Sequence, residues 1–428
     1  MSLQVGTAFN LLNVQDKSVT WSSTNPDFTV DANGTVHAPS VDALRPNGQT
    51  VITATNPAGA DSCKITVVDW TTNNYRLDYI GMESGSWVAM GRNGERYYTS
   101  GTGLYRNNNG SPIKLSDPLP YPANESFVDT PFGYFKRIND CSIYMSSDLV
   151  TWELIFTPIN PSTNKSSLLH GWAWKYDEAT DTGYIFIGEY SVNISGQRHK
   201  VYCITIGETI TSDVLIDFYA PSEYAADNNN VPAATHVHVV AIDPFTGNLW
   251  IDVGDSTAYC GMYYSTDNGA TINTFAVGSQ DYRCLSIWFT ANYIYWNVDS
   301  DVHQSVWRIR RDNIGNPALK ERVKLLDNGS LWYHMLAKDP DGVDFVIMAG
   351  AAEGQIRDWN ARIFGIWENQ DGTNRVEELA VLPSSTPDAY SPMVQLEPMF
   401  QDAEGYLYFK SRNMTPNLAI WKMQLVKL

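Results

Sequence analysis

The stretch 235–272 constrains the fold of this chain more than any other part of it; it reads THVHVVAIDPFTGNLWIDVGDSTAYCGMYYSTDNGATI. Alternating and apolar runs are separated by turn sequences such as DPFTG and STDNG, which predicts four antiparallel strands in one small sheet. A single sheet of this kind cannot bury its own faces. It must stack on copies of itself, so we expect a radial array of sheets around an axis.

The same pattern recurs along the chain from Trp70 onward. Aligned on the turn after the expected innermost strand, seven units follow one another at intervals of roughly 40 to 65 residues. They start within 84–101, 126–147, 169–190, 236–256, 281–300, 332–351 and 394–412. The sequence therefore predicts a seven-bladed β-propeller over 75–428, with six and eight blades as alternatives. We expect the C-terminal run WKMQLVKL to pair with the segment Tyr75–Ile80 and close the ring.

The composition agrees with an all-β chain and argues against nucleic acid and membranes as binding partners. The chain has 24 Tyr, 15 Phe and 14 Trp, and a formal net charge of -18. Aromatic residues favour strands, and a strongly acidic surface repels nucleic acid and anionic membranes over about 8 Å at physiological salt. We expect neither a nucleic-acid partner nor membrane insertion, since no apolar run approaches the ~18 residues that span a bilayer.

The five cysteines and the N-terminus bear on localisation. The cysteines are odd in number and lack CxxC spacing, so we interpret them as buried small apolar residues rather than disulfides or zinc ligands. The start MSLQVGTAFNLLN shows no signal peptide. We expect a chain that reaches the outside of the cell, a cell surface or a virion after removal of a leader or after cell lysis.

Residues 1–69 have a different sequence pattern from the rest of the chain. Their pattern predicts short alternating strands broken by NP, ANG, PNG and NPAG turns. The segments VTWSSTNP, VDANGTV and ITAT resemble the bacterial Ig-like group 2 (BIG2) family, through Trp21, Asn33, Gly34, Ile52 and Thr53. The resemblance implies a small β-sandwich without chemistry, used as a spacer, an adhesin module or a phage-particle decoration. The first portion is shorter than in that family, so we expect that a first strand is either missing or supplied by a neighbouring virion or surface protein.

Two predicted hairpin sequences indicate which class of propeller the chain resembles. YYSTDNGATI and MSSDLVTW resemble the Asp-box (BNR repeat) of sialidase-like propellers, S-x-D-x-G-x-x-W, although the first has Ile272 in place of Trp and the second Val150 in place of Gly. In such a turn the Asp accepts backbone N–H bonds and Gly takes a positive φ. The motif is structural. FKRIND lacks the Pro of the sialidase F-R-I-P strand, so we do not expect sialidase activity.

The candidate site lies where the innermost strands begin. Counting seven and five residues back from each inner turn gives a set rich in imidazole and aromatic groups: His170, Trp172, His236, His238, Arg283, Leu285, Trp332, His334, Gln395 and Glu397. The loops after the second strands add further polar groups at the same mouth: Glu189, Tyr190, Asp255, Asp299, Asp301, His303 and Glu353. Convergence of such groups in a concave site favours ligand binding. Purely structural, hydrogen-bonded histidines are the alternative.

Two classes of function follow from this set. The first is a carbohydrate-recognition or adhesion protein at a surface, such as a phage head or tail decoration, which binds glycan through His170, Trp172, Tyr190, His236, Arg283, Trp332, His334 and Glu397. The second is a polysaccharide lyase or glycoside hydrolase acting on an extracellular polysaccharide. The set resembles that of propeller polysaccharide lyases, which implies that Arg283 neutralises a uronate carboxylate, His236 or His238 abstracts a proton and Tyr282 protonates the leaving oxygen. The histidine pair lacks a third ligand fixed by spacing, so neither a metal nor another cofactor is predicted.

Overall fold

We describe a computed structural model of the chain. After residue 72 it describes 73–83, 87–92, 94–100, 103–108, 111–116, 126–138, 141–158, 165–166, 171–191, 198–219, 236–299, 305–325, 331–350, 360–383, 393–395, 401–412 and 420–428. Before residue 73 it describes only strand segments within 2–68.

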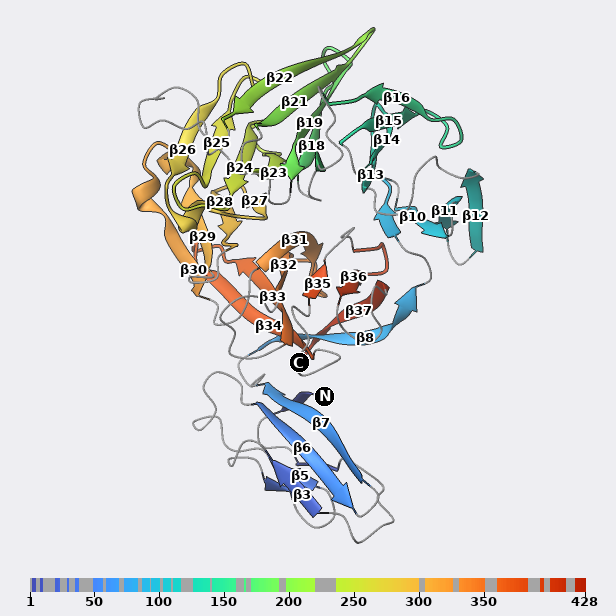
Figure 1. Ribbon diagram of the computed structural model, residues 1–428, viewed down its shortest axis with the longest axis vertical. Coiled ribbons are helices and arrows are strands. Elements are labelled where there is room, and N and C mark those ends of the chain that lie inside the picture. Colours follow the sequence, from blue (N-terminus) through green and yellow to red (C-terminus); the bar gives the residue numbers. More distant parts are fainter. Residues whose placement is uncertain are drawn as a thin grey trace.

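Seven four-stranded antiparallel sheets, the blades, surround one axis (Figure 1). Blade 1 contains β9 (Trp87–Met90), β10 (Arg96–Ser100), β11 (Gly103–Asn108) and β12 (Ser111–Ser116). Blade 2 contains β13 (Ser126–Thr130), β14 (Gly133–Arg137), β15 (Ile143–Ser146) and β16 (Glu153–Phe156). Blade 3 contains β18 (Trp172–Asp177), β19 (Thr182–Gly188), β21 (His199–Ile206) and β22 (Ile210–Phe218). Blade 4 contains β23 (His236–Ile242), β24 (Leu249–Gly254), β25 (Gly261–Ser265) and β26 (Asn273–Val277).

The remaining three blades complete the ring. Blade 5 contains β27 (Ile287–Phe289), β28 (Tyr293–Asn297), β29 (Ser305–Arg310) and β30 (Glu321–Leu325). Blade 6 contains β31 (Leu331–Lys338), β32 (Asp344–Gly350), β33 (Asn360–Glu368) and β34 (Asn374–Pro383). Blade 7 contains β35 (Met393–Gln395), β36 (Tyr406–Arg412), β37 (Ile420–Lys427) and β8 (Tyr75–Glu83). The prediction of an all-β, seven-bladed propeller is confirmed.

Ring closure follows the expectation from the sequence. The C-terminal strand β37 pairs antiparallel with β8, with Lys427 opposite Tyr75 and Ile420 opposite Glu83. Beyond the strand, the Leu428 amide donates to the Asn74 carbonyl at 2.8 Å. Joining the first and last strands in one sheet ties the two ends of the ring together by main-chain hydrogen bonds.

Inner turns of the same design connect the first two strands of several blades. Asp243, Asp339 and Asp402 each accept the backbone N–H two residues later, at 3.0 Å in all three turns. A glycine with φ between 71° and 87° ends each turn: Gly247, Gly342 and Gly405. Aspartate and glycine therefore shape these turns locally, which is why the blades could be aligned from sequence.

Apolar clusters between adjacent blades hold the ring together. Between blades 4 and 5, for example, Trp250, Phe275 and Trp296 pack in one cluster. Trp250, Trp288, Trp296 and Trp367 are fully buried. Burying one such side chain stabilises the fold by roughly 1.5 to 3 kcal/mol. Packing of the blades against one another therefore buries the apolar faces that a single blade would leave exposed.

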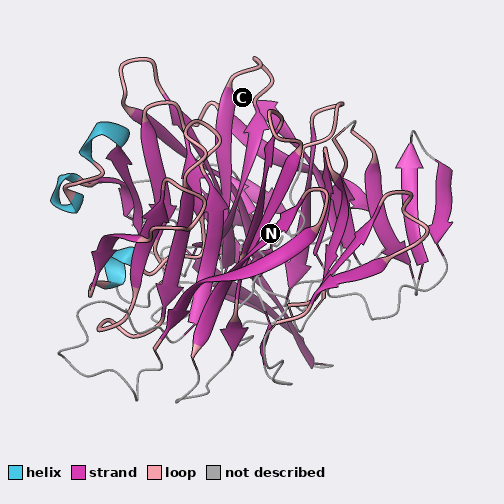
Figure 2. Cartoon of the chain, turned by 90° about the horizontal axis from the view of Figure 1, so that it is seen from above, coloured by secondary structure: helices cyan, strands magenta, loops and turns pink. Residues whose placement is uncertain are grey.

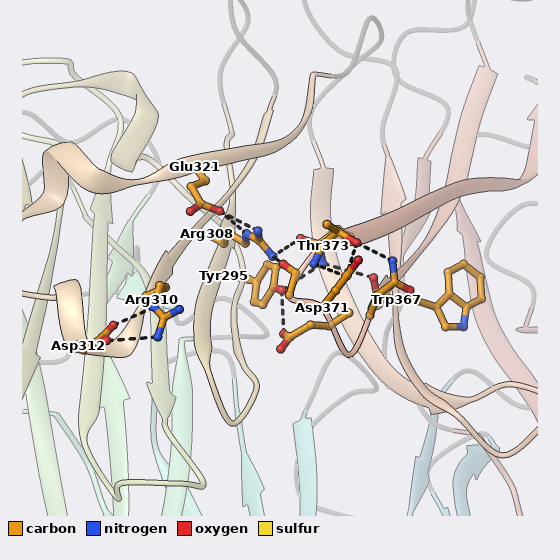
Figure 3. Close-up of polar contacts among 12 residues, drawn as sticks. Tyr295, Arg308, Arg310, Asp312, Glu321, Trp367, Asp371 and Thr373 are labelled. Carbon is orange, nitrogen blue, oxygen red and sulfur yellow. Dashed lines mark hydrogen bonds and ion pairs between the residues drawn. The ribbon is translucent and has the colours of Figure 1, made fainter.

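A polar network also joins blades 5 and 6, near the turn between β33 and β34 (Figure 3). Arg308 donates to the Asn374 side chain at 2.6 Å and the Gly372 carbonyl at 2.7 Å, and pairs with Glu321 at 2.7 Å. Tyr295 donates to Glu368 at 2.8 Å. We refer to these residues, Tyr295, Arg308, Glu321, Glu368 and Asn374, as the Arg308 network.

The strands of the blades run side by side, roughly along the axis of the ring (Figure 2). Three short 3-10 helices accompany them: η3 (Gln280–Tyr282), η4 (Arg311–Asn313) and η5 (Pro317–Leu319). Among the described residues, no helix is long and apolar enough to cross a membrane. Cys141, Cys203, Cys260 and Cys284 are buried, as expected, and form no disulfide within the described part of the chain; the side chain of Cys63 lies outside it.

The segment 1–69 contributes two further sheets. One contains β1 (Ser2–Gln4), β7 (Gly59–Val68), β6 (Gln49–Asn56) and β3 (Thr20–Ser23), and the other β2 (Ala8–Asn10), β5 (Thr35–His37) and β4 (Thr29–Val30). Packing of these sheets lies outside the described residues. The BIG2-type sandwich and the division into domains at 1–69 and 75–428 therefore stay predictions.

Candidate functional site

Two histidines at the start of β23 form the centre of the candidate site. The strand pairing with β24 shifts between Val237 and Val239, so His238 occupies a bulge. A bulge re-aims the side chain that it carries. The Nε2 atoms of His236 and His238 lie 2.9 Å apart, and the two side chains are only 3% and 2% exposed.

Carboxylates and one arginine complete the group across blades 4 and 5. Asp255, directly after β24, places its oxygens 3.2 Å from His236 Nε2 and 3.3 Å from His238 Nε2. Arg283 Nη2 lies 3.1 Å from Asp255 Oδ1 and 3.1 Å from Asp299 Oδ2. We call His236, His238, Asp255, Arg283 and Asp299 the axial cluster.

A second layer of contacts orients His238. Its Nδ1 atom lies 3.1 Å from the Cys284 carbonyl and 3.5 Å from Asp252 Oδ1. Both of these are acceptors, so Nδ1 carries a proton and Nε2 faces His236 and Asp255. Asp252 is fully buried, and its Oδ1 also accepts the Cys284 amide at 3.1 Å.

The charges in this region depend on one another. Burial disfavours the imidazolium of His238, but hydrogen bonds and attraction from Asp252 and Asp255 outweigh it and raise the pKa to about 9. Burial raises the pKa of Asp252 to about 6, against the opposing effect of His238. Burial would also raise the pKa of Asp255, yet the two imidazoles hold it well below its usual value. At neutral pH, and without a ligand, His238 is a cation between two carboxylates.

Aromatic and polar neighbours surround His236. The Tyr190 ring lies 4.1 Å from the His236 ring, tilted by 35°, and the His199 ring lies 6.4 Å away, edge-on. Tyr190 begins the short strand β20 (Tyr190–Ser191), which pairs with β17 (Lys165–Ser166). Glu189 is buried and accepts hydrogen bonds from the Lys200 amide and the Tyr202 hydroxyl, both at 2.9 Å. Its carboxylate therefore has a structural role.

A cavity of about 340 Å³ lies among the inner strands β18, β23, β27 and β31. Its walls are mostly apolar and aromatic: Trp172, Val239, Val240, Ala241, Ile242, Pro244, Ile287, Trp288, Phe289, His334 and Leu336. We call it the axial cavity. His334 is hydrogen-bonded to Ser286, and desolvation by burial lowers the pKa of His334 to about 4. The imidazole of His334 is thus neutral at physiological pH.

The structure brings together some of the residues that the sequence singled out and separates others. His236, His238, Asp255, Arg283, Asp299 and Tyr190 meet at one place, whereas Trp172 and His334 line the axial cavity. Tyr282 is not at the axial cluster: its hydroxyl contacts the Pro317 carbonyl at 3.4 Å and Lys320 at 3.3 Å. Side chains of seven candidate residues lie outside the described part of the chain: His170, Asp301, His303, Trp332, Glu353, Gln395 and Glu397.

Sequence reasoning missed Asp252. It lies on β24, inside the apolar run LWIDVG, where every residue is buried. A lone carboxylate in such a run must find a partner inside the protein, because burying an unpaired charge is costly. One carboxylate within an apolar strand could therefore have identified Asp252 as a candidate from the sequence.

Comparisons with known proteins do not place the chain in a family. No family model matches it, and no curated protein matches it. Solved structures similar to it include an oligogalacturonate lyase in complex with manganese, with 9% identity, a TM-score of 0.49 and coverage of 99% of both chains. The extracellular domain of a putative hybrid two-component system from B. thetaiotaomicron has 12% identity and a TM-score of 0.46, covering 92% of this chain and 46% of that one. An endo-1,5-alpha-L-arabinanase from Thermotoga petrophila has 12% identity and a TM-score of 0.32, covering 70% of this chain and 97% of that one.

Proposed function

We propose that the protein binds carbohydrate on the axial face of its propeller, through the axial cluster and the ring of Tyr190. The observation that carries this proposal is the meeting of Arg283, two imidazoles and two carboxylates beside an aromatic ring. Sugars present hydroxyl groups for directional hydrogen bonds and apolar ring faces for packing against aromatic side chains. A site that supplies both kinds of contact suits such a ligand.

Arg283 is the residue to vary first. Its guanidinium bridges two carboxylates at the cluster, and a hydrogen bond to a charged group contributes about 1.5 to 3 kcal/mol. Arg283→Ala is therefore expected to weaken glycan binding by roughly tenfold or more, since 1.4 kcal/mol is one decade of affinity.

A glycan array followed by titration calorimetry with the tightest-binding glycan measures this effect. The matched control is Arg310→Ala, an arginine that is 55% exposed and pairs with Asp312. Equal affinity of the parent, Arg283→Ala and Arg310→Ala would place binding elsewhere. Loss of binding in Arg310→Ala alone would do the same.

A polysaccharide lyase is the second candidate, favoured by one observation. Arg283 and both imidazoles contact the same carboxylate, Asp255, so a cation and a potential proton acceptor lie side by side. A lyase requires a cation for the uronate carboxylate and a base for the adjacent proton. A glycoside hydrolase acting through Asp255 and Asp299 is the further enzymatic alternative.

Turnover separates these enzymes from a binding protein. A lyase produces a carbon–carbon double bond that absorbs ultraviolet light, and a hydrolase produces new reducing ends. For an enzyme that uses His236 as its base, His236→Ala would abolish turnover with little change in substrate affinity, because loss of a base acts on the transition state. Binding without turnover by the parent supports recognition alone. Adhesion at a cell surface or within a phage particle stays a prediction from the sequence.

A further inference from the structure

We propose that His236, His238 and Asp255 form a binding site for one divalent transition-metal ion. The site goes beyond carbohydrate binding, because it concerns a cofactor that the proposed function does not require. The potential ligand atoms of the three side chains all lie within 4.8 Å of one another. This is the set of two imidazoles and one carboxylate that holds such ions while leaving positions open for other ligands.

The spacing of the donor atoms fits a single ion. The two Nε2 atoms are 2.9 Å apart, and each lies 3.2 to 3.3 Å from one oxygen of Asp255. Donors bound at about 2.0 to 2.1 Å to one ion are separated by roughly 3.0 Å in octahedral and 3.3 Å in tetrahedral geometry. Asp255 is 44% exposed and can rotate to present one oxygen or both.

The contacts around His238 give it the orientation of a metal ligand. Its Nδ1 atom faces the Cys284 carbonyl and Asp252, which directs the Nε2 atom towards His236 and Asp255, where a metal ion would displace the Nε2 proton. Metal-bound histidines generally make such a contact through their other nitrogen. Without an ion, His236, His238 and Asp255 contact one another through protons on the Nε2 atoms, and a bound ion would take the place of those protons.

The donor types narrow the choice of ion. Two nitrogens and one carboxylate suit Zn²⁺, Mn²⁺ and Fe²⁺, and no thiolate belongs to the group. The half-exposed Asp255 marks the side on which water or a ligand oxygen would complete the coordination. Arg283, 3.1 Å from Asp255 Oδ1, would hold the carboxylate in place.

Metal binding by the intact protein tests the site directly. After treatment with a chelator and its removal, the full chain is titrated with Zn²⁺ and, separately, Mn²⁺, and bound metal is counted by mass spectrometry of the elements. We expect one ion per chain at micromolar or tighter dissociation constant. His236→Gln, His238→Gln and Asp255→Asn should each weaken binding at least tenfold. His334→Asn, a histidine of the axial cavity outside the cluster, should retain it.

A further titration, of the parent protein with Co²⁺, needs no variant and so does not depend on whether the variants fold. Nitrogen ligation of Co²⁺ by the parent gives a saturable visible absorption band at one equivalent. No such band and no stoichiometric Zn²⁺ or Mn²⁺ binding would overturn the proposal, as would binding that the three variants retain in full. Glycan binding by a protein that takes up none of these ions would leave the proposed function standing while this proposal fails; metal binding without glycan binding would show the reverse.

Discussion

Two polar clusters each join a pair of adjacent blades, but their hydrogen bonding differs. In the Arg308 network, the guanidinium has protein partners on both blades and stacks on the Tyr293 ring at 4.1 Å. In the axial cluster, two imidazole nitrogens face each other and a half-exposed carboxylate. The first arrangement completes its own contacts, whereas the second directs several groups to one point. Convergence on a shared point, rather than polarity alone, distinguishes a ligand site from a structural tie.

The largest expected effect lies in the Arg308 network. Arg308→Ala removes contacts to Gly372, Asn374 and Glu321, and should lower the free energy of unfolding by about 2 to 3 kcal/mol. Glycan binding should not change. Denaturant titration and calorimetry measure the two effects.

Arg310→Ala is the control for this comparison. Arg310 pairs with Asp312 (Figure 3), and both side chains are more than half exposed. Its free energy of unfolding should match the parent, since exposed ion pairs contribute little. Equal destabilisation by the two substitutions, or weaker glycan binding in Arg308→Ala, would contradict the distinction between the clusters.

His334, in the axial cavity, is expected to make the stability of the folded protein depend on pH. Its pKa of about 4 in the folded protein lies below the usual 6.5, so the unfolded chain binds the proton first as pH falls. The stability is complete above about pH 6.5 and decreases as pH falls towards 4. Between pH 7 and 5 the loss is on the order of 1 to 2 kcal/mol.

Denaturant titrations of the parent and of His334→Asn at several pH values test this. The variant is expected to be less stable at pH 7 but to lose less stability on acidification. Parallel pH profiles for the two proteins would mean that His334 is not the titrating group.

The smallest effect is expected in the hairpin turns that suggested an Asp-box. Asp267 Oδ1 accepts the Thr271 amide at 2.8 Å, and Asp148 Oδ1 accepts the Thr151 amide at 2.7 Å. Hydrogen bonds accepted from the Ser265 hydroxyl and the Thr271 amide lower the pKa of Asp267, and the hydrogen bond accepted from the Thr151 amide lowers the pKa of Asp148. Asp267→Asn should lower the Tm by only a degree or two, because the amide oxygen still accepts. A loss of glycan binding would show that the rim of the propeller takes part in recognition.

These turns also show why part of the fold could be predicted from sequence. Ser265, Asp267 and Thr271 contact one another within a few residues, so their identities determine the turn. The seven blades and their closure likewise follow from alternation within strands and from Asp and Gly at inner turns. Membership of the Asp-box and BIG2 families stays a prediction.

The site was only partly predictable, because its contacts join distant segments. The register indicated His236, His238 and Arg283 as candidate residues, and the structure brings them together. The register could not show the bulge at His238 or the carboxylate of Asp252 behind it. Tyr282 was assigned with Arg283, yet its ring packs against Phe275 and Trp296, away from the cluster. Spacing gives the end of a strand at which a residue lies, and packing decides where its side chain points.

The most direct test of the central claim is a crystal structure of the protein soaked with the glycan that binds most tightly on an array. We predict sugar density within hydrogen-bond distance of Arg283 and His236 and against the ring of Tyr190. Full-occupancy density on the outer strands or on residues 1–69, with the axial cluster unchanged, would contradict the account.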